Sequence, residues 1–512
     1  MAGVGKQGLG SMVDRNSDMI DLLIVGGGIN GAGIARDAAG RGLSALLVEQ
    51  DDLASHTSSA STKLIHGGLR YLEYGEFRLV REALIERERL LNMAPHIIWP
   101  LSFVLPQTQS PRPAWMVRLG LFLYDHLGGR EKLPGTRTVA LERSTLGDGL
   151  SPRKGKAFVY SDCWVEDSRL VVLNAIDAAE RGAKIATRTK LIDAQREGDG
   201  WVATIEAAGE TRTVRARALV NAAGPWVADV IGRAHGARAD RGVRLVKGSH
   251  IIVPKLYEGD HAFMLQNDDR RIVFAIPYEG RFTLVGTTDE PWTDAPAKAS
   301  ISGAETTYLL DTVNRYFAKK TGQADIVWSY AGIRPLYDDH SANASAVTRD
   351  YVLDLDTGAE GESRAPMLNI FGGKITTYRK LAEHAMRELA RFFPDAGGAW
   401  TAGAALPGGD IADADFDAFL RALTARHPDL SPALLRRLAR AYGTRVNAIL
   451  AHGDLGPDLG GGLHTAEVDY LVTSEWARTV EDILYRRSKL GLHVPPETTE
   501  RLAAYLAGQG VA

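Results

Sequence analysis

Residues 21–50, DLLIVGGGINGAGIARDAAGRGLSALLVEQ, decide the fold class of this chain. The apolar run 22–25 is too short for a helix and predicts a strand that is buried on both faces. A glycine motif, G-x-G-x-x-G, follows it, and the Ala-rich segment 29–41 predicts a helix. A second apolar strand, 44–48, ends in the acid Glu49. Together these features are typical of a βαβ unit that binds a dinucleotide.

The chemistry of a bound dinucleotide explains both the glycines and the acid. Gly26, Gly28 and Gly31 permit a tight turn and let backbone N–H groups approach a pyrophosphate at the helix N-terminus, where the helix dipole favours negative charge. Glu49 is placed to accept hydrogen bonds from the ribose hydroxyls of adenosine. A Gly-rich turn is the alternative for the glycines alone, and the motif by itself does not separate FAD from NAD.

The composition of the 512 residues limits the classes of protein that fit. The length suits roughly two or three domains, and the 45% hydrophobic and 24% charged content is ordinary for a soluble globular protein. A formal net charge of −3 argues against nucleic acid as a partner. The lone Cys163 excludes an intrachain disulfide and suits a reducing compartment, and no metal is expected. No segment has the roughly 20 apolar residues of a membrane-spanning helix, so any membrane contact is expected at the surface.

Two further stretches close to the glycine motif suit a flavin nucleotide. The Ser/Thr-rich loop 55–62 carries Thr57, Ser58 and Ser61, whose hydroxyls can donate to a diphosphate, although a helix-capping loop is the alternative. The glycine pair after His66 permits close approach of the backbone to a flat ligand.

The order of the later strands favours FAD over NAD. Three alternating runs between residues 191 and 214 predict a β-meander, and the buried strand 218–224 then closes in A-x-G at Gly224. A βαβ opening, a meander and a late strand of this kind are typical of FAD-binding enzymes.

Two helices have patterns that allow more than one interpretation. Residues 76–93 predict a long, charged amphipathic helix on the surface. Residues 112–127 have large apolar side chains at helical spacing, which favours a core or inter-domain helix. The alternative is a helix that lies on a membrane surface, with Trp115 at the headgroups and Arg112 and Arg118 near phosphates.

An antiparallel sheet is predicted in the second half of the chain as the substrate domain. Val/Ile/Phe-rich segments with period-2 stretches predict its strands: 244–254, 271–288, 325–333 and 346–355. A further strand, 366–371, ends in a glycine pair that starts a helix running to about residue 393. The N–H groups at this helix start suit the pyrimidine edge of a flavin, and the positive end of the helix stabilises a reduced flavin.

We therefore predict an α/β plus α fold class. A Rossmann-like FAD-binding domain is interleaved with an antiparallel β-sheet substrate (cap) domain, and an all-helical C-terminal domain follows. The Gly/Ala/Pro-rich composition around 394–409 predicts a linker. The predicted boundaries are a flexible tail at 1–17, the FAD-binding domain at 18–395 with the cap mainly at about 60–160 and 235–350, the linker at 396–409 and the helical domain at 410–512.

Several longer motifs occur in a fixed order along the chain: GGGINGAGIARDAAGRG, TSSASTKLIHGGLRYLE, RPAWMVRLGLFLYDHLG, YSDCWVED, VNAAGPWV, KGSHIIVP, RIVFAIP, GTTD, GIRPL, TRDY and FGGKITTYRKLAEHA. Through them the chain resembles the FAD-dependent glycerol-3-phosphate dehydrogenases, close to the bacterial aerobic type, from about residue 18 nearly to the C-terminus. The resemblance implies a p-hydroxybenzoate-hydroxylase-like FAD fold with a substrate-capping sheet. It implies oxidation of sn-glycerol 3-phosphate to dihydroxyacetone phosphate, with electrons passed to membrane quinone. It also implies peripheral contact with the cytoplasmic face of the inner membrane, the protein being otherwise in the cytoplasm, with a homodimer as one possible assembly.

The resemblance also assigns site residues. His250 is the candidate base because the pKa of a histidine lies near neutral pH, and Arg334 can share the role by lowering the pKa of the substrate hydroxyl. A dianionic phosphate needs several fixed cations, and arginine offers paired donors. The substrate-binding positions are Arg70, Tyr71, His250, Arg334, Arg349 and Lys374. The cofactor-binding positions are Gly26, Gly28, Asn30, Gly31, Glu49, Thr57, Ser58, Ser61, His66, Gly67, Gly224, Gly373, Lys374 and Thr376.

Other functions fit parts of the same pattern. A glycerol-3-phosphate oxidase performs the same oxidation with oxygen as acceptor and makes hydrogen peroxide, and an amino-acid or amine oxidase has the same type of fold. A non-catalytic flavin-binding membrane scaffold is the alternative outside the enzymes. Candidate membrane contacts are residues 112–123 and the basic helices near 478–489.

Overall fold

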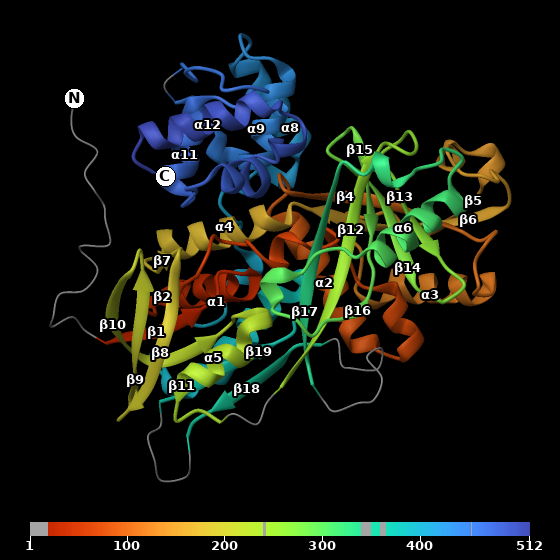
Figure 1. Cartoon of the computed structure of the whole chain (residues 1–512). Helices are drawn as coiled ribbons and strands as arrows, with labels where there is room; N and C mark the ends of the chain where they lie inside the picture. The colour runs from red at the N-terminus through yellow and green to blue at the C-terminus, as the bar shows by residue number, and fades with distance from the viewer. Residues whose placement is uncertain (1–18, 239–241, 339–349, 359–364, 452, 512) are drawn as a thin grey trace.

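The computed structural model describes residues 19–238, 242–338, 350–358, 365–451 and 453–511. The chain forms two β-sheets, and the C-terminal helices lie above them in the view of Figure 1. The α/β plus α fold class predicted from the sequence is confirmed. The predicted tail, 1–17, lies outside the described residues.

The first sheet has nine strands and is built around β1 (Ile20–Val25). β1 pairs in parallel with β2 (Ala45–Val48) and with β10 (Glu210–Asn221), and its apolar residues 22–25 are buried. Helix α1 (Ile29–Gly40) joins β1 to β2, so the predicted βαβ unit is confirmed. The other strands of this sheet are β7 (Lys184–Ala186), β8 (Thr189–Glu197), β9 (Gly200–Ala207), β11 (Ala234–His235), β18 (Val352–Asp356) and β19 (Met367–Phe371).

Strand β10 belongs to both the meander and the parallel core of the sheet. Its first half pairs antiparallel with β9, and its second half pairs in parallel with β19. The sequence predicts two separate strands here, at 211–214 and 218–224, whereas the structure joins them. The burial pattern explains the join, because alternate residues are buried in the first half and consecutive residues in the second.

Helices cover both faces of the first sheet. On one face α1 packs between α4 (Asp167–Glu180) and α7 (Tyr378–Leu389). On the other face α5 (Val227–Arg233) contacts β8, β10 and β19. These layers leave the carboxyl ends of β1 and β2 at the edge where a nucleotide binds in folds of this type.

The second sheet is the predicted cap, and its longest pairing joins β12 (Val243–Pro254) to β17 (Trp328–Tyr337). Helix α6 (Gly303–Tyr316) packs on this sheet. The predicted strand at 346–355 does not continue the cap, because its described part, β18, pairs with β19 in the first sheet. The other cap strands are β3 (Leu64–Ile65), β4 (Ile98–Pro106), β5 (Arg137–Ala140), β6 (Lys156–Val165), β13 (Ala262–Gln266), β14 (Ile272–Tyr278), β15 (Phe282–Gly286) and β16 (Glu290–Pro291).

Helix α2 (Phe77–Met93) is not the surface helix that its charges predict. Glu86 and Arg87 are buried. Arg379 donates to both oxygens of Glu86 at 2.6 Å, and Arg87 donates to Asp162 at 2.7 Å. The prediction was wrong because the charges are neutralised by partners far away in the sequence.

The favoured prediction was a core helix, but helix α3 (Ala114–Leu127) lies at the surface with several of its large apolar side chains exposed. Val117 and Leu121 face inward, whereas the large apolar side chains at Trp115 and Phe122 are exposed, Trp115 by 71%. None of the helices in the described residues is both long and apolar enough to cross a membrane.

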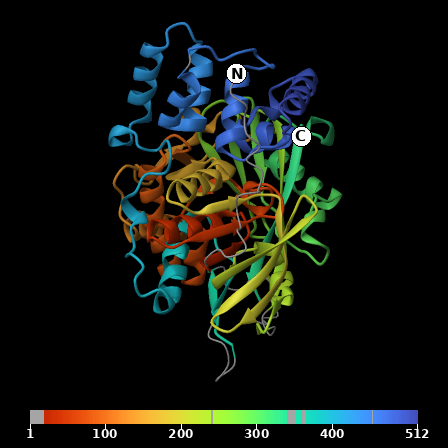
Figure 2. The ribbon, with the colours of Figure 1, turned by 90° about the vertical axis from the view of Figure 1, so that its left-hand side faces the viewer.

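The C-terminal part is a bundle with its own apolar core, seen at the top of Figure 2. The predicted linker, 396–409, is packed rather than free, because the Trp400 ring lies against Gly40 and under the guanidinium groups of Arg36 and Arg181. The bundle comprises α8 (Phe416–Arg426), α9 (Pro432–Tyr442), α10 (Val446–Leu450), α11 (Thr465–Ser474), the π-helical turn η14 (Asp482–Arg487) and α12 (Pro496–Gly508).

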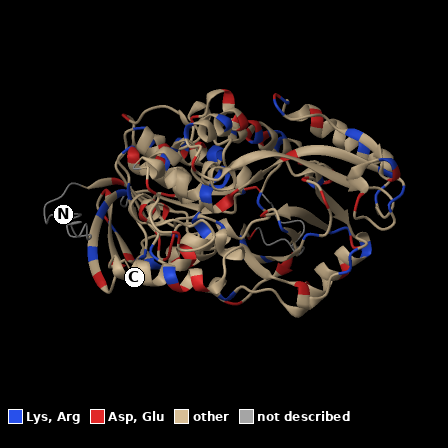
Figure 3. Cartoon of the chain, turned by 90° about the horizontal axis from the view of Figure 1, so that it is seen from above, with Lys and Arg blue, Asp and Glu red and all other residues tan. Residues whose placement is uncertain are grey.

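In the view from above in Figure 3, basic and acidic residues are interspersed along the chain. The basic residues near 478–489 were a candidate membrane contact, and the structure contradicts this, because Arg486 and Arg487 are buried and face Asp52.

Candidate active site

Two adjoining cavities form the candidate active site. The first lies at the carboxyl ends of β1 and β2, and the second lies between the first sheet and the cap. Thr57, Ser58 and Gly373 line both cavities. The two cavities therefore make one continuous site, as expected for a nucleotide cofactor whose reactive ring reaches a substrate.

The first cavity depends on glycines at the end of β1. Gly26 has φ +112°, and a Cβ there would lie 2.5 Å from the carbonyl oxygen of Ala222. A Cβ on Gly31 would overlap the carbonyl oxygen of Gly26. Gly31 does not line the cavity, so its role is to let the helix start close to the strand rather than to touch the cofactor.

The first turn of α1 faces the cavity. Ser58 Oγ accepts a hydrogen bond of 3.0 Å from the Ile29 N–H, which attaches the Ser/Thr-rich loop to the helix start. The side-chain amide of Asn30 donates to the carbonyl oxygen of Gly372 at 3.1 Å. Its Oδ1 atom is buried and has no hydrogen-bond partner among the described residues, so it is available to a ligand in this cavity.

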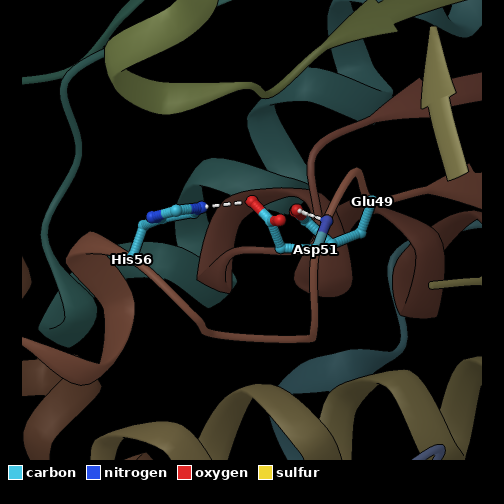
Figure 4. Close-up of side chains that lie close together, drawn as sticks. All are labelled: Glu49, Asp51 and His56. Atoms are coloured by element: carbon cyan, nitrogen blue, oxygen red, sulfur yellow. Dashed lines mark hydrogen bonds and ion pairs between the residues drawn. The ribbon is translucent and has the colours of Figure 1, made fainter. Parts of the chain in front are cut away.

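The acid at the end of β2 is fixed by the backbone around it (Figure 4). Glu49 accepts hydrogen bonds from the Gly27 N–H at 2.6 Å and from the Asp51 N–H at 2.9 Å. Burial raises the pKa of the Glu49 carboxyl. His56 Nε2 lies 2.8 Å from an oxygen of Asp51. Glu49 still lines the cavity, in the position that the sequence predicts for ribose recognition.

Two of the predicted cofactor residues have other partners. Gly67 lines neither cavity: its N–H donates to the Tyr124 hydroxyl at 2.7 Å, and a Cβ there would overlap Leu84. The structure therefore gives Gly67 a role in packing and places its neighbours His66 and Gly68, not Gly67, at the second cavity. Ser61 lines the second cavity, but its hydroxyl donates to Asp167 at 2.8 Å. The remaining predicted cofactor residues line one or both cavities: Gly28, Gly224, His66, Lys374 and Thr376.

The second cavity has a volume of about 430 Å³, large enough for a ring and a small substrate. Arg349 lies outside the described residues. The other predicted substrate residues all line it: Arg70, Tyr71, His250, Arg334 and Lys374.

His250 is held rigidly on β12. Its Nε2 atom lies 2.9 Å from the Thr62 hydroxyl, and its ring stacks on Tyr330 with 4.8 Å between centroids. Burial lowers the pKa of His250 well below its usual value, and the charges of Arg334 and Lys63 lower it further. The imidazole is therefore neutral at neutral pH, which is the protonation state that a general base requires.

Cationic groups from four separate segments line the second cavity: Arg70, Arg271, Arg334 and Lys374. Arg334, on β17, donates to Asp289 at 2.6 Å and to the Thr287 hydroxyl at 3.2 Å. Lys374 Nζ lies 3.8 Å from the centroid of the Tyr71 ring. Arg70, on η3 (Leu69–Tyr74), donates to a tyrosine hydroxyl through one nitrogen, while its Nε is buried without a partner among the described residues.

Four residues of the site were not predicted as site residues from the sequence. Thr62 and Tyr330 contact His250, Asp289 pairs with Arg334, and Arg271 also lines the second cavity. Thr62, Asp289 and Arg271 lie in motifs that carry the resemblance, which was the available signal. Tyr330 had no signal, because a tyrosine in a strand is most often a core residue.

Comparison with known proteins agrees with this geometry. The family model described as FAD dependent oxidoreductase matches residues 21–379, and the model described as the C-terminal domain of alpha-glycerophosphate oxidase matches residues 399–507. Among solved structures, the glycerol-3-phosphate dehydrogenase of Bacillus halodurans complexed with FAD is similar, with a TM-score of 0.76 and 27% identity. The similarity covers 96% of this chain and 91% of that one. These matches and the cavity at the end of β1 define the class: the chain is an FAD-dependent oxidoreductase.

Two curated relatives narrow the family. The glycerol-3-phosphate dehydrogenase of Pseudomonas aeruginosa is 56% identical over 498 residues, covering 96% of both chains. The D-erythritol 1-phosphate dehydrogenase of Brucella abortus is 56% identical over 481 residues, covering 93% of this chain and 95% of the relative. The chain belongs to the family of the FAD-dependent glycerol-3-phosphate dehydrogenases, and its cofactor is FAD.

Proposed function

We propose that this protein oxidises sn-glycerol 3-phosphate to dihydroxyacetone phosphate and passes the electrons to membrane quinone. The observation that carries the proposal is the meeting of a neutral, buried His250 with Arg70, Arg334 and Lys374 in the cavity next to the FAD cradle. A small phosphoester with a secondary hydroxyl needs this combination: fixed cations for the phosphate and a base for the hydroxyl proton.

Each residue has a separate role in this proposal. Bound FAD supplies the acceptor for the hydride that leaves C2 of the substrate. His250 accepts the proton of the C2 hydroxyl through a ring nitrogen. Arg70 and Lys374 offset the charge of the phosphate, while Arg334, held by Asp289, lowers the pKa of the hydroxyl. Burial of His250 keeps water away from the proton-transfer step.

Anaerobic titration with sn-glycerol 3-phosphate tests this proposal. We expect the flavin absorbance to bleach as the substrate is added, with one dihydroxyacetone phosphate formed for each flavin reduced. An unchanged flavin spectrum at millimolar substrate would favour the non-catalytic flavin-binding scaffold instead.

A second substrate is supported by one specific observation. The Brucella abortus relative, whose name states D-erythritol 1-phosphate as its substrate, is as similar to this chain as the Pseudomonas relative is. Both compounds are phosphorylated polyols with a secondary hydroxyl, so the cations and base suit either. Comparison of kcat/KM for the two compounds decides between them, and a higher value for D-erythritol 1-phosphate would overturn our choice.

The proposal of membrane quinone as acceptor requires contact with the cytoplasmic face of the inner membrane, and an exposed apolar patch supports contact with a membrane. On α3 the patch comprises Trp115, Met116, Leu119 and Phe122. Helix α3 packs against η3, the element that carries Arg70 and Tyr71 of the substrate cavity. A peripheral protein of this kind buries such side chains among lipid headgroups.

Sedimentation with anionic lipid vesicles tests the membrane contact. We expect the double variant Trp115→Ser/Phe122→Ser to bind vesicles at least about tenfold more weakly, because two large apolar groups no longer enter the bilayer. Val327→Ser, at a 45% exposed apolar position on the cap, is the matched control and keeps wild-type binding. Equal binding of all three proteins would remove α3 from the contact. Faster reoxidation of the reduced protein by oxygen than by a soluble quinone would favour the oxidase.

A further inference from the structure

A short basic segment of the helical domain, Arg486 to Lys489, lies next to the loop 51–63, which lines the active site. Arg486 and Arg487 end the π-helical turn η14, and Lys489 follows two residues later. The loop they face, residues 51–63, is called the cofactor loop here because Thr57 and Ser58 in it line both cavities. A π-helical turn is uncommon and often marks a functional site.

The basic segment holds the cofactor loop at its beginning through Asp52. Arg487 donates to both oxygens of Asp52 at 2.8 Å, and Arg486 Nε donates to one of them at 2.8 Å. Asp52 is 2% exposed and Arg487 is fully buried. Asp52 stands three positions after Glu49, the acid at the ribose end of the cofactor cavity. These hydrogen bonds are buried and join charged groups, and bonds of this type are stronger than hydrogen bonds between neutral groups.

The same segment reaches the end of the loop through Lys489. Lys489 Nζ lies 3.8 Å from Asp167 Oδ1. This oxygen also accepts a hydrogen bond of 2.7 Å from Lys63. Lys63 also donates to the carbonyl oxygen of Ser59, inside the loop. The neighbouring residue, Thr62, is the one that contacts His250. The helical domain therefore contacts the beginning of the loop directly, at Asp52, and is linked to its end through Asp167, the carboxylate that Lys489 and Lys63 share.

The backbone of the loop needs such support. Ala54 has φ +60° and Lys63 has φ +59°, values that residues with a side chain adopt only at a cost in free energy. Lys489, on the opposite side of the contact, has φ +62°. Conformations of this kind persist where surrounding contacts determine them, and the strained residues here lie next to the charge pairs.

We propose that the basic segment of the helical domain holds the cofactor loop in its FAD-binding conformation, so that docking of this domain sets the affinity for FAD. Asp52, Arg486 and Arg487 are then positioning residues, which act on the cofactor through Glu49, Thr57 and Ser58. This role goes beyond the proposed reaction and does not depend on which phosphoester is oxidised. It also gives a function to a domain whose sequence offers no chemical motif.

The rate of FAD release measures this role directly, without substrate. The holoprotein is diluted, and the rise in flavin fluorescence reports release. We expect release about tenfold faster, or more, in Arg487→Gln and in Asp52→Asn, because the first change leaves Asp52 with Arg486 alone and the second removes the carboxylate that joins both arginines to the loop. Arg487→Lys keeps the charge and one donor and restores part of the affinity.

The matched control is Arg437→Gln, inside the helical domain. Arg437 pairs with Glu467 through two hydrogen bonds of 2.7 Å and touches no residue of the cofactor loop. This variant lowers the melting temperature of the apoprotein while FAD release stays within about twofold of wild type. The proposal is overturned if Asp52→Asn releases FAD at the wild-type rate, or if Arg437→Gln speeds release as much as Arg487→Gln does. Should Arg487→Gln not fold, Asp52→Asn, which keeps the shape of its side chain, supplies the same comparison.

Discussion

The two cavities of the active site share Thr57, Ser58 and Gly373, but each is shaped mainly by a different part of the chain. The cofactor cavity is centred on the backbone of one continuous βαβ unit, where Gly26 and Gly31 bring strand and helix together, and segments from elsewhere in the chain complete its walls. The substrate cavity is shaped by side chains from η3, β12, β17 and the segment after β19. A single added Cβ can abolish a site whose shape depends on backbone atoms. A site lined by several side chains should instead lose activity gradually, as each side chain is replaced. The following predictions test that difference.

The largest effect is expected in the cofactor cavity. Gly31→Ala places a Cβ where the carbonyl oxygen of Gly26 already lies. Since both atoms belong to fixed backbone elements, the helix must move away from the strand end and the pyrophosphate site is lost. We expect purified protein without bound FAD and without activity, measured as the ratio of flavin absorbance to protein.

The matched control for this substitution is another glycine in a helix. Gly232, in α5, has nothing within 4 Å of the position that a Cβ would take. Gly232→Ala should keep full flavin content, because a helix tolerates alanine better than glycine. A Gly31→Ala protein that binds FAD normally would show that the backbone of this cavity is adaptable after all.

The difference between the local βαβ unit and the substrate cavity, which distant segments form, also explains how much of the site could be predicted from the sequence. The βαβ unit lies within thirty consecutive residues, so its strands, helix and acid followed from local spacing. The contact between Thr62 and His250 joins residues 188 positions apart, and the pair of Arg379 and Glu86 spans 293 positions. No local pattern encodes such contacts, which is why α2 was expected on the surface. The substrate residues came from the family resemblance instead.

The second largest effect is expected at the base. His250→Gln removes the proton acceptor but keeps a side chain that can hydrogen-bond to Thr62. We expect kcat to fall by about 10²- to 10⁴-fold with normal FAD content, the range typical of lost general base catalysis. Steady-state turnover and the flavin ratio, measured on the same sample, check this.

His261 provides the control for this substitution. It is buried in the cap like His250, and burial lowers its pKa to about 4, but it lines neither of the two cavities. His261→Gln should leave kcat near the wild-type value. If His250→Gln keeps nearly full turnover, another group is the base.

A smaller effect is expected for one cation of the substrate cavity. Arg334→Ala should lower kcat/KM by roughly 2 kcal/mol, or about 30-fold, the value of a hydrogen bond to a charged group. The loss is partial because His250 remains as the base and Arg70 and Lys374 still bind the phosphate. FAD content should not change. Arg315→Ala removes an exposed arginine that pairs with Asp268 in the same domain, and wild-type kcat/KM is expected there. Equal values for the two variants would exclude Arg334 from the site.

The smallest effect concerns the pH dependence of kcat/KM, which we expect to report the protonation of His250 and its response to Arg334. The base must be neutral to accept a proton, and burial together with the charges of Arg334 and Lys63 lowers the pKa of His250. The wild-type kcat/KM should therefore fall only at pH values below the usual pKa of histidine, about 6.5. In Arg334→Gln one positive charge is gone and the Asp289 carboxylate loses its ion pair with Arg334, and both changes raise the pKa of His250. The acidic limb of the pH profile should move to higher pH, whatever the overall level of activity. A limb that stays in place, or moves to lower pH, would mean that the titrating group is not next to Arg334, and the cations of this cavity would then act on the phosphate alone.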